Sequence, residues 1–456
     1  MLTHKTHLSV VAVFNYFKQH LQAGAQSTGE YLSSDAAEPA VWQGDVARYL
    51  GIEGELVTTN GFLAAAMGRK PIALPNDFST SDEMRAYLEA TPLRPSDARP
   101  SLAVILPDGT QGTIDALSDD RQMAQVRRQG RRRVDEIAVA DLAVRGAQPH
   151  WAPGDRLTQR QTKRVGFDMT LSVPKGFSLL LNAGDARLDG AFDRALLGLM
   201  QRVEDEAFVR ARGEGRSDDA RLRSSSLLWT SFKHETSRPV RQQDGTWFTD
   251  PHRHGHVFVF NTTRSTHDGE EKLYALEPGP INERFPYFEA VFDNLLAKEV
   301  QALGYGVHRR GQSFEIDGIT PQMVQAFSLR TAEIEEFAAA AGLSPEQKAR
   351  AGWFLRASKD EGQVDDMRVH MAERQPEMVK RLDQLTADAE GAVSTTKLAS
   401  EGQRKVAQVA VDAAISAAIE RSLERGLERK STLSLDRFMR DALIHAAGRA
   451  TEQQIL

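Results

Sequence analysis

The stretch DPHRHGHVFVFNTTR, from Asp250 to Arg264, joins a histidine cluster to an apolar run that is typical of a strand. His252, His254 and His256 fall within five positions, although the chain has only 12 histidines. Because side chains alternate across a strand, His254 and His256 should point to one face, with Cα atoms roughly 6–7 Å apart. That spacing lets both rings bind one ion. His252 should precede the strand, in a loop.

The preceding strand, expected within SSSLLWTSFKHETS, offers a third ligand, His234. Asp244-Gly245 is a turn signal between the two strands, and pairing as a hairpin would bring His234 to His254 and His256. Three neutral imidazoles suit Zn, Mn, Ni or Co, and can hold Mg with added waters; the open positions are typical of a catalytic site. The alternative is that they are ordinary polar strand residues, because H-x-H is a short motif.

A carboxylate lies in another expected strand, within RVGFDMTLSVPKGFSLLLNAG. Asp168 shares one face of this strand with Thr170 and Ser172, and apolar residues form the other face. Because a buried carboxylate is costly without a partner, Asp168 should either orient a ligating histidine or act as a base. The alternative is an exposed aspartate with no role in chemistry.

The order of strand and helix patterns predicts an α+β fold. AGDARLDGAFDRALLGLMQRVEDEAFVRAR has the spacing of one long amphipathic helix between strands. We expect a two-layer sandwich, with helices covering one face of a central antiparallel sheet. Residues 1–330 would form this unit, residues 69–163 would be an inserted module, and residues 331–456 would be a helical linker.

Composition limits the classes of partner. The 456 residues carry 57 basic and 63 acidic side chains, a net charge of -6, so a nucleic-acid surface must be local. Residues 121–164 hold eleven basic and four acidic residues, and 11 − 4 gives +7, which fits either a DNA contact or a solvated charge run. The candidate DNA-binding residues are Arg127, Arg128, Arg131, Arg132, Arg133 and Lys175.

Absent sequence features narrow the possibilities further. The chain has no cysteine, which excludes disulfides, thiolate metal sites and cysteine nucleophiles. The sequence has neither a signal-peptide pattern nor an apolar run long enough for a bilayer, so we expect a cytosolic protein without membrane insertion. The remaining candidate nucleophiles include Tyr16, in VFNYFKQHL, and Tyr31, in GEYLSSD. A phenol, with a pKa near 10, needs a base or metal to attack, and each tyrosine is more often a packing residue.

Taken together, these motifs resemble the MobF class of conjugative relaxases, which belongs to the HUH endonuclease superfamily. The resemblance rests on VWQGDVARYLGIEGEL, GFDMTLSVPKGFS, FKHETSR, DPHRHGH, EVQALGYGVHRRGQSFEIDGI and FSLRTAEIEEF. It covers residues 1–68 and 164–340. The tail SLDRFMRDALIHAAGRATEQQI resembles the stretch that joins relaxase to helicase, so we expect the N-terminal piece of a longer relaxase-helicase.

The resemblance implies an HUH or palm-like sheet and a divalent metal ion (Mg, Mn or Zn). His234, His254 and His256 would hold the ion, with Asp168 as base or histidine orienter. Tyr16 would attack the scissile phosphate at a transfer origin, forming a 5′-phosphotyrosyl intermediate that starts conjugative transfer. The implied partners are single-stranded origin DNA, relaxosome accessory proteins and a transfer coupling protein. The protein would be a monomer in the bacterial cytoplasm, exported to a recipient cell with its DNA.

The chain departs from the family pattern in three places. The family often has two tyrosine pairs, whereas here Phe17 follows Tyr16 and Leu32 follows Tyr31, which leaves a second cleavage by Tyr31 open. Gly176 stands where the family has serine, and residues 69–163 have no counterpart in it. A metal-stabilised single-stranded DNA-binding module without cleavage is therefore the alternative function, and a metal hydrolase of small phosphoesters is a third.

Overall fold

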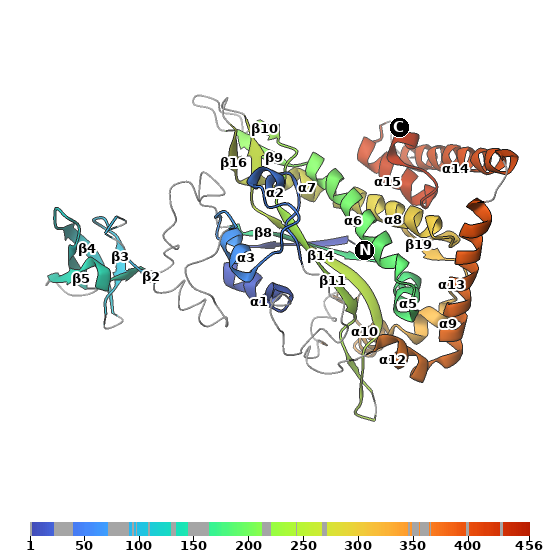
Figure 1. The fold of residues 1–456 in the computed structure, drawn as a ribbon, viewed down its shortest axis with the longest axis horizontal. Helices are drawn as coiled ribbons and strands as arrows, with labels where there is room; N and C mark the ends of the chain where they lie inside the picture. The colour runs from blue at the N-terminus through green and yellow to red at the C-terminus, as the bar shows by residue number, and fades with distance from the viewer. Residues whose placement is uncertain are drawn as a thin grey trace.

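A four-stranded antiparallel sheet forms the centre of the protein (Figure 1). The computed structural model describes residues 2–21, 40–71, 91–93, 95–96, 98–107, 110–128, 134–144, 164–211, 220–242, 244–266, 271–344, 347–348, 355, 364, 366–397, 401–428 and 432–456. The sheet has the order β1-β8-β14-β11. Its strands are β1 (Leu2–His7), β8 (Gly166–Ser172), β11 (Trp229–Thr236) and β14 (Pro251–Phe260).

The register of the sheet places the candidate site residues on one face. His234 lies opposite His254 in the β11–β14 ladder, and Asp168 lies opposite Phe258 in the β14–β8 ladder. The predicted hairpin is confirmed: β12 (Val240–Arg241) pairs with β13 (Trp247–Phe248) around the expected turn. The expectation that His252 lies in a loop is wrong. The ladder runs on to Thr236 and Pro251, so His252 belongs to β14.

Helices α5 (Lys175–Ala183), α6 (Arg187–Asp205) and α8 (Phe285–Ala302) cover the face opposite the histidines. Phe167, Met169 and Val257 from the sheet enter this core. The predicted long helix ends earlier than expected. Residues after Asp205 form β9 (Phe208–Ala211), because their side chains alternate and their backbone pairs with β10 (Ala220–Arg223) and β17 (Leu276–Glu277).

The histidine face also carries helices, so the expected two-layer arrangement with helices on one face is incomplete. Phe232, Phe258 and Phe260 lie on that face and need cover from water. Helices α1 (Val10–Leu21) and α3 (Thr59–Ala66) supply it. Ser9 Oγ accepts from the Ala12 N–H at the beginning of α1, and α2 (Asp45–Leu50) ends at Gly51.

Within residues 69–163, six short strands build a separate antiparallel sheet of order β2-β7-β3-β4-β5-β6 (cyan in Figure 1). The strands are β2 (Thr91–Pro92), β3 (Ala103–Ile105), β4 (Gln111–Leu117), β5 (Met123–Arg128), β6 (Val134–Ala138) and β7 (Ala143–Val144). Val104, Ile114 and Val126 lie in a hydrophobic core that belongs to this sheet. Residues 108–109, between β3 and β4, lie outside the described residues, and β3 and β4 pair antiparallel on either side of them.

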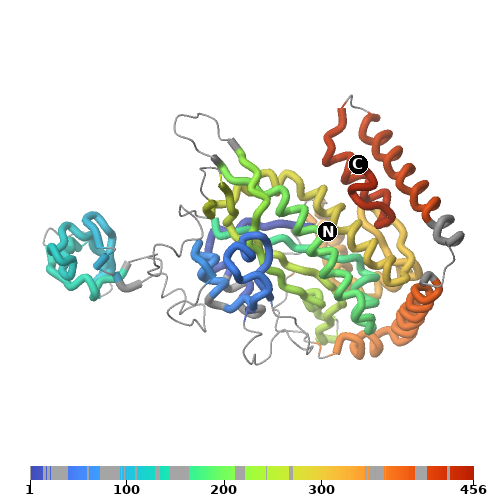
Figure 2. Tube along the Cα trace, turned by 45° about the horizontal axis from the view of Figure 1, so that its top comes forward, coloured from blue at the N-terminus to red at the C-terminus, as the bar shows by residue number. Residues whose placement is uncertain are grey.

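After residue 331, all the regular elements in the described residues are helices. They lie along one side of the part of the chain that contains the central sheet (orange and red in Figure 2). Leu382, Met439 and Leu443 join the core that also contains Phe292 of α8. These helices therefore extend that core. The remaining elements are β10 (Ala220–Arg223), β15 (Thr263–Ser265), β16 (Lys272–Tyr274), β17 (Leu276–Glu277), α7 (Gly279–Glu283), β18 (Val307–Arg310), β19 (Ser313–Ile316), α9 (Pro321–Ala326), α10 (Leu329–Ala340), α12 (Met367–Arg374), α13 (Pro376–Lys397), α14 (Glu401–Leu427), α15 (Leu435–Ala446) and α16 (Glu452–Ile455).

Candidate metal centre

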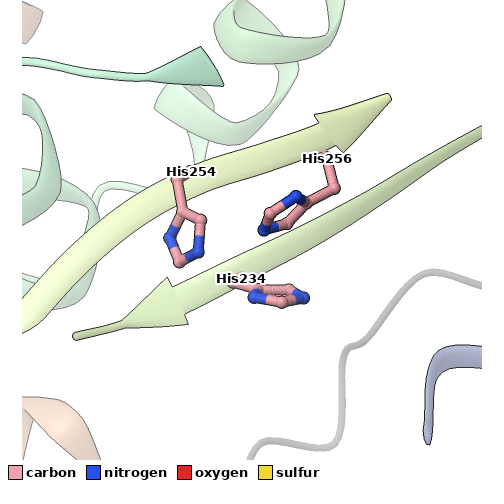
Figure 3. Close-up of side chains that lie close together, drawn as sticks. All are labelled: His234, His254 and His256. Carbon is pink, nitrogen blue, oxygen red and sulfur yellow. The ribbon is translucent and has the colours of Figure 1, made fainter. Parts of the chain in front are cut away.

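Three imidazole rings converge on the open end of the histidine face. His254 and His256 project from β14 toward His234 of β11 (Figure 3). One nitrogen from each ring lies within 4.8 Å of the other two. The ring centroids are 4.7 Å apart for His234 and His254, and 5.0 Å apart for His234 and His256. This spacing fits three ligands of one cation, with positions left open for other groups.

A hydrogen bond to the backbone directs the Nε2 lone pair of His254 toward the other two rings. The Nδ1 of His254 lies 2.9 Å from the carbonyl oxygen of His252, which can only accept, so Nδ1 carries the proton. The Nε2 lone pair of His254 is then free to bind a cation. Burial lowers the pKa of His254 well below its usual range, which favours the neutral ring that metal binding needs. The stacked neighbour His252 has its pKa lowered to about 4, also mainly by burial.

Asp168 contacts the second ring, that of His256. Its Oδ2 lies 3.0 Å from Nδ1 of His256, and the Oγ1 of Thr170 lies 3.2 Å from the same nitrogen. Both members of the Asp168–His256 pair are buried. A carboxylate accepting from Nδ1 fixes the tautomer and leaves Nε2 for a metal, as in many carboxylate–histidine–metal sites. The contact of Thr170 escaped prediction, although its place on the same face as Asp168 was a signal for it.

Replacing Asp168 with asparagine should weaken Mn²⁺ binding by about 10- to 100-fold, because the outer partner of a ligating histidine commonly contributes that much. Isothermal titration of the purified protein measures the affinity. Asp193→Asn is the matched control, since Asp193 pairs with Lys233 on the opposite face of the sheet. Equal affinities for Asp168→Asn and the parent would contradict an orienting role.

Helix α1, which carries Tyr16, reaches the histidine cluster through the neighbouring residue Phe17. Tyr16 belongs to α1 and precedes Phe17, whose ring packs against Phe232 at 4.6 Å and approaches the His256 ring at 6.4 Å. The helix therefore borders the metal centre. The side chain of Tyr16 and the whole of Tyr31 lie outside the described residues.

The expected DNA-binding residues that the structure describes already have protein partners. Arg127 pairs with Asp115, and Arg128 pairs with Asp135, so carboxylates offset both charges within the six-stranded sheet. Arg131, Arg132 and Arg133 lie outside the described residues. Lys175 of α5 donates to the carbonyl oxygen of Pro251 at the start of β14, 2.8 Å away. Burial lowers its pKa.

Most of the chain matches one known protein family. The family described as TrwC relaxase matches residues 12–381, which is most of the chain and includes all three histidines. The chain belongs to the TrwC relaxase family. Members of this family are enzymes that nick and rejoin DNA. The resemblance of the sequence motifs to the MobF class of conjugative relaxases is thereby confirmed. No curated protein matches this relaxase.

Solved structures share the fold of the relaxase. A metal-free structure of the conjugative relaxase TrwC in complex with oriT DNA has 25% identity and a TM-score of 0.51, covering 83% of this chain and 98% of that one. A metal-bound complex has 25% identity and a TM-score of 0.50, covering 84% and 98%. TrwC with a 27-mer DNA that comprises the recognition hairpin and the cleavage site has 24% identity and a TM-score of 0.51, covering 83% and 98%.

The relaxase has a structural reason for Gly176, where the family pattern has serine. Glu315 Oε1 accepts from the Gly176 N–H at 3.2 Å, at the beginning of α5. A Cβ atom on residue 176 would lie 2.3 Å from that oxygen and 2.8 Å from Cγ1 of Ile319. Both neighbours are buried, so glycine makes room for the Glu315 carboxylate.

Restoring the family serine with Gly176→Ser should therefore destabilise the relaxase by about 1–3 kcal/mol, the usual cost of overfilling a packed region. Urea unfolding followed by circular dichroism measures the change. Gly391→Ser is the control, because Gly391 also lies in a helix and a Cβ there meets nothing within 4 Å. A serine at 176 that leaves the unfolding midpoint unchanged would show that Glu315 can move aside without cost.

Proposed function

We propose that this relaxase cleaves single-stranded DNA at a transfer origin by attack of Tyr16 on the scissile phosphate. The phenolic oxygen forms a bond to phosphorus as it loses its proton. The bond from phosphorus to the 3′ oxygen breaks, and that oxygen takes up a proton. The DNA 5′ end is then linked to the tyrosine, and the retained phosphoester allows rejoining without ATP. This step would start conjugative DNA transfer.

The convergence of His234, His254 and His256 is the observation that carries the proposal. We infer that they hold a divalent cation, with Mg, Mn and Zn as candidates. Such a cation supplies Lewis acidity, which offsets the charge that develops on the phosphate oxygens. The burial of Asp168 against His256 favours the orienting role for this carboxylate over the role of base.

The other proposed roles follow from the residues around the centre. Lys175 lies beside the start of β14 and would attract a DNA phosphate. Contact between the inserted module and DNA would depend on Arg131, Arg132 and Arg133, because Arg127 and Arg128 already pair with carboxylates. Tyr31 is proposed for a second cleavage only. We keep residues 1–330 as the transesterase unit, 69–163 as an insertion and 331–456 as a helical link toward a helicase.

Proposed partners and location follow the family. Solved complexes of TrwC with oriT DNA support single-stranded origin DNA as the partner of this chain. Relaxosome accessory proteins and a transfer coupling protein are further proposed partners of a monomer. The bacterial cytoplasm, with export to a recipient cell, is the proposed location. Among the described residues, no helix combines the length and apolarity needed to cross a bilayer.

An oligonucleotide from the cognate transfer origin, labelled at its 3′ end, tests the proposed reaction. With Mn²⁺ we expect a labelled covalent protein–DNA adduct that survives denaturing electrophoresis, and EDTA should prevent it. Release of a free 5′-phosphate without an adduct would instead indicate a hydrolase. Binding of the oligonucleotide with neither product would support the DNA-binding module without cleavage activity.

A further inference from the structure

The start of β14 is held by side chains from a separate helix. Besides Lys175 at the Pro251 carbonyl, Ser178 Oγ of α5 accepts from the Arg253 N–H at 3.0 Å. These contacts matter for the metal centre because the ring of His254 hydrogen-bonds to the backbone of this same segment. A shift of the backbone at His252 would therefore turn the His254 ring.

Asp250, the residue before β14, is fixed from a more distant part of the chain. Its Oδ2 accepts from the Leu329 N–H at 2.6 Å, at the beginning of α10. Its Oδ1 pairs with Nη1 of Arg374, the last residue of α12, at 2.9 Å. The Asp250 side chain is 2% exposed, so its charge needs compensation inside the protein, which Arg374 supplies by direct pairing and Lys175 by its nearby charge.

Arg374 is itself held rigidly. Its Nη2 donates to the carbonyl oxygen of Ala326 at 3.0 Å. The guanidinium lies over the ring of Phe248 at 5.1 Å and over the ring of Phe327 at 5.3 Å. A planar group with two rings and two oxygen partners has little freedom, and lysine could not reproduce this set of contacts.

We propose that Arg374 is a positioning residue of the metal centre, so that α12 belongs to the site although it lies more than a hundred residues along the chain. Arg374 fixes Asp250, and Asp250 fixes the backbone through Pro251 to His252. The His252 carbonyl then sets the ring of His254 through its Nδ1 proton. The inference rests on the proposed metal-binding function of the three histidines.

Mn²⁺ affinity of the full chain, measured by isothermal titration, tests the inference. Arg374→Gln should weaken binding about tenfold, because the loss of an outer partner of a ligand commonly costs 10- to 100-fold. Arg368→Gln is the matched control. Arg368 lies on the same helix, but it is exposed and pairs with Asp383 of α13. It should bind Mn²⁺ like the parent protein.

Hydrogen exchange provides a second measurement, which should not depend on Mn²⁺ if Arg374 only stabilises the fold. Mn²⁺ should slow exchange at the α12 amides of the parent protein, since coupling between two sites is reciprocal, and should not do so in Arg374→Gln. Arg374→Lys keeps a charge beside Asp250 and should fold even if the glutamine variant does not. It should show an intermediate affinity, because it cannot donate to Asp250 and Ala326 together.

The outcomes separate this inference from the function on which it rests. Parent-like affinity in Arg374→Lys and in a folded Arg374→Gln, or equal losses in Arg374→Gln and Arg368→Gln, would overturn the positioning role while leaving the metal site intact. Failure of the parent to bind Mn²⁺, or binding unchanged in His254→Ala, would instead reject the metal site, and the role of Arg374 would fall with it.

Discussion

Tyr16→Phe should abolish the covalent adduct between the relaxase and origin DNA. The substitution removes one oxygen atom, which is the proposed nucleophile, so we expect the cleavage rate to fall on the order of 10⁴-fold or more. Affinity for the uncut oligonucleotide should stay within about twofold, because phosphate contacts supply most of such binding. Denaturing electrophoresis of the 3′-labelled oligonucleotide measures the adduct, and fluorescence anisotropy measures the affinity.

Two other tyrosines serve as controls for this experiment. Tyr49→Phe changes an exposed tyrosine of α2 that lies under Arg264, and it should form the adduct normally. Tyr31→Phe should also keep the first cleavage if Tyr31 acts only in a second one. A normal adduct in Tyr16→Phe combined with none in Tyr31→Phe would assign the nucleophile to Tyr31.

His254→Ala should lower cleavage by about 100- to 1,000-fold, because Lewis-acid stabilisation contributes several kcal/mol and each 1.36 kcal/mol is tenfold in rate. DNA affinity should change far less, by about threefold at most, since it depends on phosphate contacts spread over the surface. Single-turnover cleavage in Mn²⁺ and anisotropy with the same oligonucleotide give the two numbers.

His308→Ala is the matched control, because His308 is an exposed histidine of β18 that pairs with Asp317. It should leave cleavage unchanged. Equal losses of cleavage and DNA affinity in His254→Ala would argue that the histidines support the fold instead of the chemistry. Thermal unfolding of each variant identifies that case directly.

Local patterns in the sequence predicted much of the metal centre. The two-residue period of a strand placed His254 and His256 together, and the Asp244-Gly245 turn brought His234 opposite them. The same period put Asp168 on one face of its strand with Thr170 and Ser172, but only the pairing of β8 with β14 makes this the histidine face. The placement of the three histidines depends on neighbours in sequence and on one hairpin, which is why the residues alone were sufficient for it.

The long-range contacts around the metal centre could not be predicted in this way. The pair between Asp250 and Arg374 spans 124 residues, and the contact of Gly176 with Glu315 spans 139. No local period relates positions so far apart. The strand β9 was missed for another reason: four alternating residues at the end of a helical pattern are too short to interrupt it, and their pairing partners come later in the chain.

The opposition of His234 and His254 across two neighbouring strands has a consequence for a protein without cysteine. A cation shared by these rings would join positions 20 residues apart (254 − 234) and clasp the two arms of the hairpin. It would act as a removable crosslink that stabilises the folded hairpin, because the three rings converge on one ion only in the folded chain. Chelation would then loosen this hairpin first.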